Sequence, residues 1–196
     1  MKRFLPGLRA IVVLLLPVAL LSGCATSYLL DNNVQSFSNL SAVPAGATYR
    51  FDRLPSQQAT PDQGKLEELA GPALAQAGLK RDDAAPKFGV EVRARAQRAV
   101  SPWSDPWDVW AWGGRRHWGW GFGGPFPRLE SPWYHREITL IVRELGSNRV
   151  VYETHAVNDG PWSDSLSVLP AMFQAALQGF PNPPQGVRRV DIQVGS

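Results

Sequence analysis

The sequence has a single cysteine, Cys24, among its 196 residues. One thiol cannot form an internal disulfide, and it cannot build a thiolate metal site, which takes several cysteines. Long hydrophobic runs are missing as well. The apolar run at residues 10–21 holds 12 residues, whereas a membrane-spanning helix takes about 20, and Pro17 inside the run disfavours a permanent membrane helix. These absences exclude a disulfide framework and argue against a transmembrane helix.

The chain from Cys24 onward has no excess of positive or negative charge. The full chain has 20 Lys and Arg against 17 Asp and Glu, and the three extra positive charges are Lys2, Arg3 and Arg9. From Cys24 onward the chain is formally neutral. Nucleic-acid binding depends on Lys and Arg that neutralise phosphates, so no nucleic-acid partner is expected.

Motifs for catalysis or phosphate binding are also missing. The chain has no Gly-x-Ser-x-Gly turn and no Walker loop, and the spaced glycines of residues 119–123 lie in an aromatic run. The three histidines are His117, His135 and His155. A zinc site needs three or four converging ligands, and a hairpin centred on Ser147 would separate His135 from His155. No metal, no cofactor and no enzymatic activity are therefore expected.

Two pairs of acidic residues are the remaining candidates for acid–base chemistry. Asp105 and Asp108 form one pair, and Glu67 and Glu68 form the other. Both pairs are interpreted as turn and solvent residues. A glycosidase would need two carboxyl groups about 5–10 Å apart across a cleft. A hydrolase or transferase acting on envelope glycan, with acids such as Asp105 and Asp108, is the alternative function.

The N-terminal residues have the layout of a secretory signal peptide: a positive start, a short apolar run, and the small residues of Leu21-Ser22-Gly23-Cys24. Because a cysteine follows the small residues, the leader resembles that of bacterial lipoproteins. This resemblance implies that Cys24 is lipidated, with palmitate, and becomes the mature N-terminus. Secretion without a lipid is the alternative. By resemblance to Gram-negative sorting rules, Ala25 in place of Asp favours the outer membrane, with the domain facing the periplasm.

The expected organisation is a signal peptide over residues 1–23, a lipidated N-terminus and short tether over 24–33, and one domain over 34–196. Within the domain, alternation and turn residues predict strands at 27–37, 47–54, 88–97, 136–145, 149–157 and 190–194. This order predicts an α+β fold: an antiparallel-rich sheet with meander-like pairing, two helices on one face, and a long Trp/Gly-rich insert at 101–134.

Two helices are predicted from capping signals and helical spacing. Thr60-Pro61 suits a helix start, and Gly71-Pro72 predicts a kink or break further along. The second helix opens at Ser165 or Ser167, and Gly179 caps it. Its apolar stripe is centred on Phe173 and consists of Leu166, Leu169, Met172, Phe173, Ala176 and Leu177.

The insert is the most unusual part of the chain. Seven of the eight tryptophans lie in it, with six glycines at 113–124 and a basic pair; the candidate binding surface is Trp103, Trp107, Trp110, Trp112, Arg115, Arg116, Trp118, Trp120 and Trp133. Three interpretations are open. The rings pack on each other and on the sheet, or they bind an envelope protein or glycan, or they contact the membrane, since Trp favours the headgroup level.

Two further expectations concern the strands. Arg93 and Arg95 lie on the outer face of the 88–97 strand, which suggests either an anionic ligand site or, more simply, a solvated face. If the 136–157 hairpin is centred on Ser147, His155 faces Thr139 and His135 faces Asp159.

Several short segments of the chain resemble a known family. They are Thr48-Tyr49-Arg50-Phe51, Val90-Glu91-Val92, the pairing of Leu140-Ile141-Val142 with Val150-Val151-Tyr152, and Ala176-Leu177-Gln178-Gly179-Phe180-Pro181. Their order over residues 27–182 is similar to that in a family of Gram-negative envelope lipoproteins known as domain of unknown function 4136. The resemblance implies a lipoprotein and a fold, and it carries over no catalytic residue.

Overall fold

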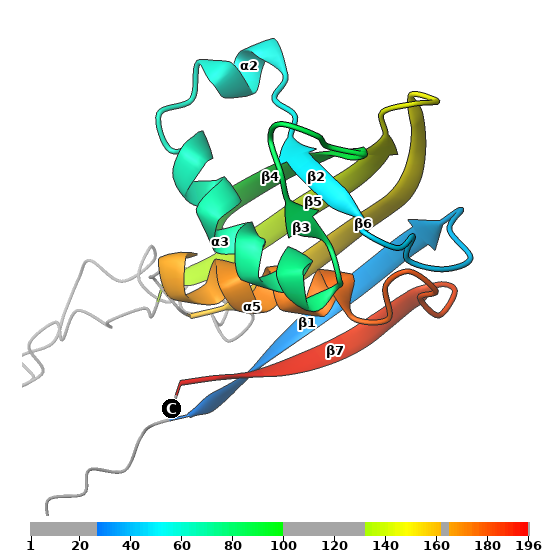
Figure 1. Cartoon of the computed structure of the whole chain (residues 1–196). Helices are drawn as coiled ribbons and strands as arrows, with labels where there is room; N and C mark the ends of the chain where they lie inside the picture. Colours follow the sequence, from blue (N-terminus) through cyan, green and yellow to red (C-terminus); the bar gives the residue numbers. More distant parts are fainter. Residues whose placement is uncertain (1–26, 100–131, 162–164, 196) are drawn as a thin grey trace, which may run out of the picture. The chain divides into compact units, whose positions relative to one another are not determined.

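The computed structural model describes residues 27–99, 132–161 and 165–195. Leu29–Val194 form one compact unit. Its elements are β1 (Tyr28–Ser38), β2 (Thr48–Phe51), α2 (Pro55–Gln58), α3 (Gln63–Gln76), β3 (Lys80–Arg81), β4 (Phe88–Ala99), β5 (Trp133–Glu144), β6 (Arg149–Gly160), α5 (Ser165–Leu177) and β7 (Val187–Val194). The fold is a mixed one of strands and helices, as predicted (Figure 1). Among the described residues, no helix is long and apolar enough to cross a membrane.

The strands form one seven-stranded, mostly antiparallel sheet in the order β3-β2-β4-β5-β6-β1-β7. The predicted meander is wrong at its start, because β1 does not pair with β2. Instead β1 pairs antiparallel with β6, and β2 lies parallel to both β3 and β4. The reason is the helical connection: α3 returns the chain across the sheet between β2 and β3, which makes those two strands parallel.

The β5–β6 hairpin has the predicted register. Thr139 lies opposite His155 and His135 lies opposite Asp159, as a turn centred on Ser147 requires. A β-bulge at Val142/Arg143 shifts the pairing by one residue next to the turn. In the turn, Asn148 adopts a positive φ of 55°, a conformation that asparagine tolerates better than most residues.

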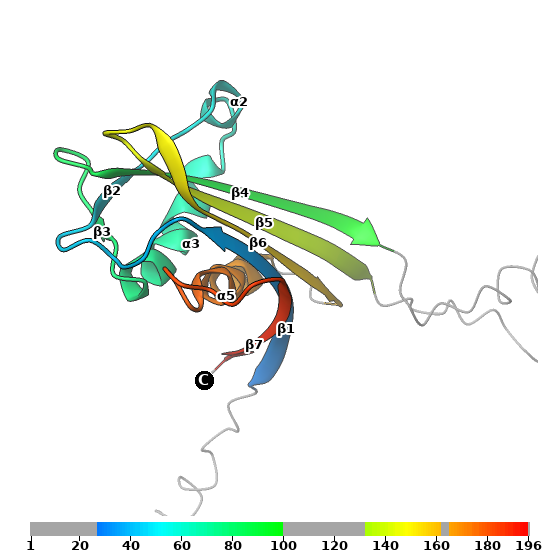
Figure 2. The same ribbon diagram turned by 90° about the vertical axis from the view of Figure 1, so that its right-hand side faces the viewer.

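In the pairing of the sheet, four strand ends lie on the same side. Each of the neighbouring pairs β4–β5, β5–β6 and β6–β1 is antiparallel, so β4 and β6 end on the side on which β5 and β1 begin. The Trp/Gly-rich insert connects the end of β4 at Ala99 with the start of β5 at Trp133, while the start of β1 lies apart from these two ends (Figure 2). β1 starts inside the range 24–33 that was expected to be a tether.

The first long helix begins later than predicted. Thr60 does not cap it; its hydroxyl donates to the carbonyl oxygen of Ser56 (3.1 Å) and closes the short helix α2, which the sequence did not suggest. α3 begins at Gln63 and continues through Pro72 without a break. Pro72 is exposed, so water can solvate the carbonyl oxygen that loses its helical donor.

The core lies between the helices and the sheet. α3 packs against β4, α5 packs against β5, β6 and β7, and the two helices contact each other. In α5, Met172, Phe173 and Ala176 are fully buried, as predicted, but Leu166 is 56% exposed. Leu166 lies in the first turn of α5, beyond the helix-covered core. Gly179 follows the helix with φ 85°, as expected for a C-terminal cap.

Hydroxyl groups of the sheet form hydrogen bonds with the backbone at the C-terminal end of α5. Tyr152 Oη and Thr154 Oγ1 both donate to the carbonyl oxygen of Ala176, at 3.1 and 3.0 Å. The Ser36 hydroxyl lies 2.8 Å from that of Thr154. The last carbonyl groups of a helix have no partner within the helix, so these hydroxyls satisfy one of them.

Candidate functional site

Most residues of the predicted binding surface lie outside the described residues, as do Cys24, His117 and the pair Asp105/Asp108. Trp133 is the member that the structure describes. It is half-buried at the first position of β5, opposite Ala99. The next aromatic ring, Tyr134, stacks under the guanidinium of Arg136 at 5.0 Å.

The outer face of the sheet carries a row of hydrogen-bonded polar side chains. Glu153 Oε1 lies 2.9 Å from His155 Nε2, and His155 Nδ1 lies 3.1 Å from Thr139 Oγ1. Carboxylate, imidazole and hydroxyl are the groups of a hydrolytic triad. A triad also needs free backbone N–H donors for the oxyanion. Thr139 is in β5, whose backbone pairs with β4 and β6 on its two sides. The row is therefore interpreted as a cross-strand polar cluster.

The second histidine pair lies nearer the insert end of the sheet. His135 Nδ1 and Asp159 Oδ1 are 2.8 Å apart, and both side chains are nearly half exposed. Over the described ranges, no three His, Cys, Asp or Glu side chains converge as metal ligands would.

The predicted basic face of β4 is partly neutralised by its own strand. Arg93 donates to Glu91 Oε1 at 2.6 Å, and Arg95 lies opposite Glu137 of β5. Both arginines are exposed. An anionic ligand at Arg93 and Arg95 remains a prediction.

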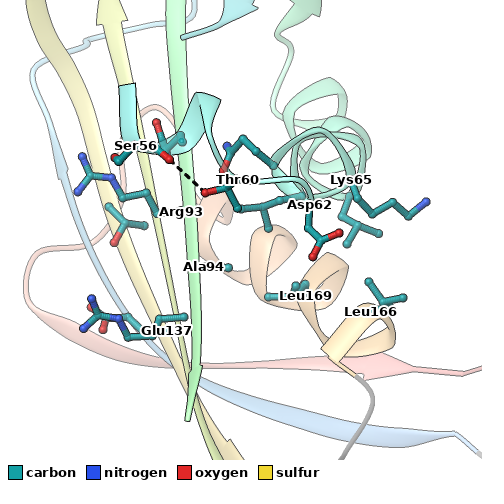
Figure 3. Close-up of a pocket in the computed structure, with 15 residues that line it drawn as sticks. Ser56, Thr60, Asp62, Lys65, Arg93, Ala94, Glu137, Leu166 and Leu169 are labelled. Atoms are coloured by element: carbon teal, nitrogen blue, oxygen red, sulfur yellow. Dashed lines mark hydrogen bonds between the residues drawn. The ribbon is translucent and has the colours of Figure 1, made fainter. Parts of the chain in front are cut away.

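A groove of about 890 Å³ lies between α2, the start of α3, the start of α5 and the outer half of β4. Its apolar part consists of Ala94 and four leucines, and its rim is polar; those residues are Leu66, Leu69, Leu166, Leu169, Ser56, Thr60, Asp62 and Lys65. Figure 3 shows Arg93 and Glu137 on one side of β4 and Leu166, Leu169 and Lys65 on the other. The groove thus runs along the β4 strand itself.

A buried ion pair lies behind the groove residue Gln63, whose Nε2 donates to Glu67 Oε1 at 3.4 Å. Glu67 is only 3% exposed, so the interpretation of this residue as a solvent residue is wrong. Its two carboxylate oxygens accept from Arg53 Nε and Nη2, each at 2.6 Å. This hydrogen bond and the charge of Glu67 raise the pKa of Arg53. The helix periodicity turns Glu67 inward, and the bidentate arginine makes its burial tolerable.

Comparison with protein families matches the DUF4136 description, a domain of unknown function, over residues 33–182. The chain belongs to the DUF4136 family. This confirms the family that the strand and helix segments indicate, and it leaves the lipoprotein anchor a prediction. It assigns no catalytic or binding residue to this DUF4136 chain. No curated protein matches the sequence.

Solved structures resemble the DUF4136 chain in fold. A PDZ domain protein from Parabacteroides distasonis has 13% identity and a TM-score of 0.50; the match covers 86% of this chain and 39% of that one. Two PelC dodecamer structures from Paraburkholderia phytofirmans have 13% and 12% identity and TM-scores of 0.45 and 0.49, covering 78% of this chain and 99% of theirs. At 13% identity the likeness to the PDZ domain protein extends to the fold alone.

Sequence reasoning missed the groove of the DUF4136 chain. Its lining comes from α2, which the sequence does not predict, from α3, which begins later than predicted, and from α5, which begins at Ser165 as predicted. Alternation showed which side chains of β4 share a face, but it contains no signal for which strand lies beside β4. The exposed Leu166 is the residue that could have pointed to it, and it was assigned to the core.

Proposed function

We propose that this DUF4136 chain is a non-enzymatic binding module, anchored in the outer membrane by a lipid on Cys24 and facing the periplasm. In this proposal the Trp/Gly-rich insert at 101–134 is the surface that binds an envelope partner. The fold proposal that accompanies it is that α3 and α5 together cover one face of the sheet. The packing of α3 on β4 and of α5 on β5 and β6 supports that arrangement.

The observation that carries the proposal is the common side of the sheet on which these strands end or begin. The insert is rooted at Ala99 and Trp133, on the side of the sheet on which β1 begins. Where the strands are paired, three strand spacings, or roughly 14 Å, separate β4 from β1, whose register with β6 begins at Asn33. Cys24 precedes Leu29 by five residues, which span at most about 18 Å. A lipid on Cys24 would therefore hold the root of the insert near the bilayer surface.

The composition of the insert supports binding over core packing. Seven of the eight tryptophans of the chain lie in this one insert, together with six glycines. Clustered aromatic residues with few charges are typical of interfaces.

Cys24→Ser is expected to abolish lipid attachment. Without the thiol no thioether to lipid can form, so labelling by radioactive palmitate should disappear and a larger, unprocessed precursor should accumulate. Ser22→Ala is the matched control, because it keeps a small residue before the cysteine, and it should be labelled like the parent. Unchanged labelling and size of Cys24→Ser would contradict the anchor.

Replacement of residues 104–130 by a short Gly/Ser linker is expected to abolish co-purification of the partner from detergent-solubilised envelope. The β4–β5 ladder, Phe88–Ala99 with Trp133–Glu144, is formed without those residues, so the variant should still unfold cooperatively near the parent temperature. Ser147→Ala, in the exposed turn at the other end of the β5–β6 hairpin, should retain the partner. A missing thermal transition would show instead that the tryptophans are structural.

A further inference from the structure

One edge of β4 is paired with a strand along less than half of its length. β2 pairs with β4 only at Tyr49↔Phe88, Arg50↔Gly89 and Phe51↔Val90. Asp52 N then donates to Val90 O at 2.9 Å, and the chain turns away into α2. Within the described ranges, no strand lies on this side of β4 beyond Val90.

Side chains occupy the next carbonyl along this edge. Val92 O accepts from Gln57 Nε2 at 2.9 Å and from Gln63 Nε2 at 3.1 Å, and both glutamines are buried. The side-chain amides of Gln57 in α2 and Gln63 in α3 thus replace strand pairing at the place where β2 ends. Because backbone groups alternate between the two sides of a strand, Ala94, Ala96 and Arg98 also direct their N–H and C=O groups to this edge.

The edge beyond Val92 is accessible. Every residue from Arg93 to Arg98 is exposed, although β4 pairs with β5 along this whole stretch. Natural sheets usually cover or blunt such an edge, since a row of free backbone groups is a template for another strand. Here the residues that direct their backbone to the edge include two alanines, which leave room beside them.

The groove lies alongside this same edge. Its apolar lining comes from α3 and α5 and consists of Leu66, Leu69, Leu166 and Leu169. Figure 3 shows Leu166 and Leu169 on the same side of β4 as Ala94. On the opposite side of the strand are Arg93, which donates to Glu91, and Arg95, which lies opposite Glu137 of β5. A strand added at the edge would project alternate side chains to these two sides. One set would meet leucines, and the other set would meet arginines.

We propose that the outer half of β4 binds an extended peptide segment of a partner protein by β-strand addition, in line with β2. Strand addition draws affinity from main-chain hydrogen bonds and specificity from pockets for alternate side chains. The leucine-lined groove selects Val or Leu at every second position, and Arg93 and Arg95 select Glu at the positions between. This site is separate from the insert proposed above to bind an envelope partner.

The test uses the whole chain and a synthetic peptide of about seven residues, the length of a typical strand, in which Val or Leu alternates with Glu. Residue-resolved hydrogen exchange is measured with and without the peptide. The amides of Ala94, Ala96 and Arg98 should become protected. Those of Arg93, Arg95 and Gln97 should not change, because they already belong to the ladder with β5.

Two variants and one altered peptide sharpen the result. Ala96→Pro removes an N–H that faces the free edge and leaves the β5 ladder intact, so affinity should fall about tenfold or more. Ala96→Ser keeps the N–H and should bind like the parent. A peptide with Lys in place of Glu should bind several-fold more weakly, with the difference reduced by salt.

Three outcomes would overturn the proposal. The first is that the peptide protects no amides, or protects both alternating sets equally. The second is that the Ala94, Ala96 and Arg98 amides are already protected at every protein concentration without peptide, which would mean that the chain covers its own edge. The third is protection that grows with protein concentration, which would mean that a second copy of the chain occupies the edge.

Discussion

Phe173→Ala is expected to lower the free energy of unfolding by about 3–5 kcal/mol. Phe173 lies in the middle of α5 with 0% exposure, and its neighbours Met172 and Ala176 are equally buried. Removing the ring deletes apolar surface buried between the helix and the sheet, and it leaves a cavity that the surrounding side chains fill only in part. An unfolding free energy of about 5–15 kcal/mol is usual for a domain, so this single change removes a large share of it.

Chemical denaturation of the folded chain measures this loss. Gln174→Ala, one position along the same helix, is the control, because Gln174 is exposed and surface changes of this kind usually shift stability by less than about 0.5 kcal/mol. If the Phe173→Ala variant had the same denaturation midpoint as the parent, α5 would not pack on the sheet as described.

The second large effect is expected from the paired change Tyr152→Phe and Thr154→Val. Both hydroxyls donate to the carbonyl oxygen of Ala176. Burial raises the pKa of Tyr152, so its phenol stays protonated and remains a donor at neutral pH. Each single change leaves one donor in place and should cost about 1 kcal/mol. The pair leaves a buried acceptor without a partner and should cost about 3–4 kcal/mol, more than the two single losses added together.

A double-mutant cycle by chemical denaturation tests this shared role. Thr139→Val is the matched control. It removes a hydroxyl from the same sheet, but on the half-exposed outer face, where His155 and water compete for it. It should change stability by less than about 0.5 kcal/mol. Strict additivity, with no extra loss in the pair, would show that the two hydroxyls do not satisfy one carbonyl.

Local patterns predicted what depends on neighbours in the sequence. The turn Gly146-Ser147-Asn148 gives the facing pairs of the β5–β6 hairpin correctly, because a tight turn fixes register over the whole ladder. Phe173 is buried as expected, because helical spacing alone determines which side chains share its stripe. Family membership was also visible, in short strand and helix segments that keep their order.

The same patterns gave wrong predictions where residues distant in the sequence determine burial, capping or strand pairing. Glu67 was expected in solvent, but Arg53, from the loop before α2, makes a bidentate ion pair that allows the carboxylate to be buried. Thr60 looked like a helix cap, but its hydroxyl closes α2 instead. The open edge of β4 could not be inferred, because it exists only through the shortness of β2 and the position of the glutamines Gln57 and Gln63.

The position of β1 has a consequence for the order in which the chain folds. β1 is the first strand to be synthesised, yet it contacts β6, and Asn158 bonds the carbonyl oxygen of Asp31 across 127 residues of sequence. Closing so long a loop costs entropy before any contact repays it. The β5–β6 hairpin has a short loop and can form early. β1 and β7 are then expected to join a sheet that already exists, which makes the β1–β7 edge the last part of the domain to be completed.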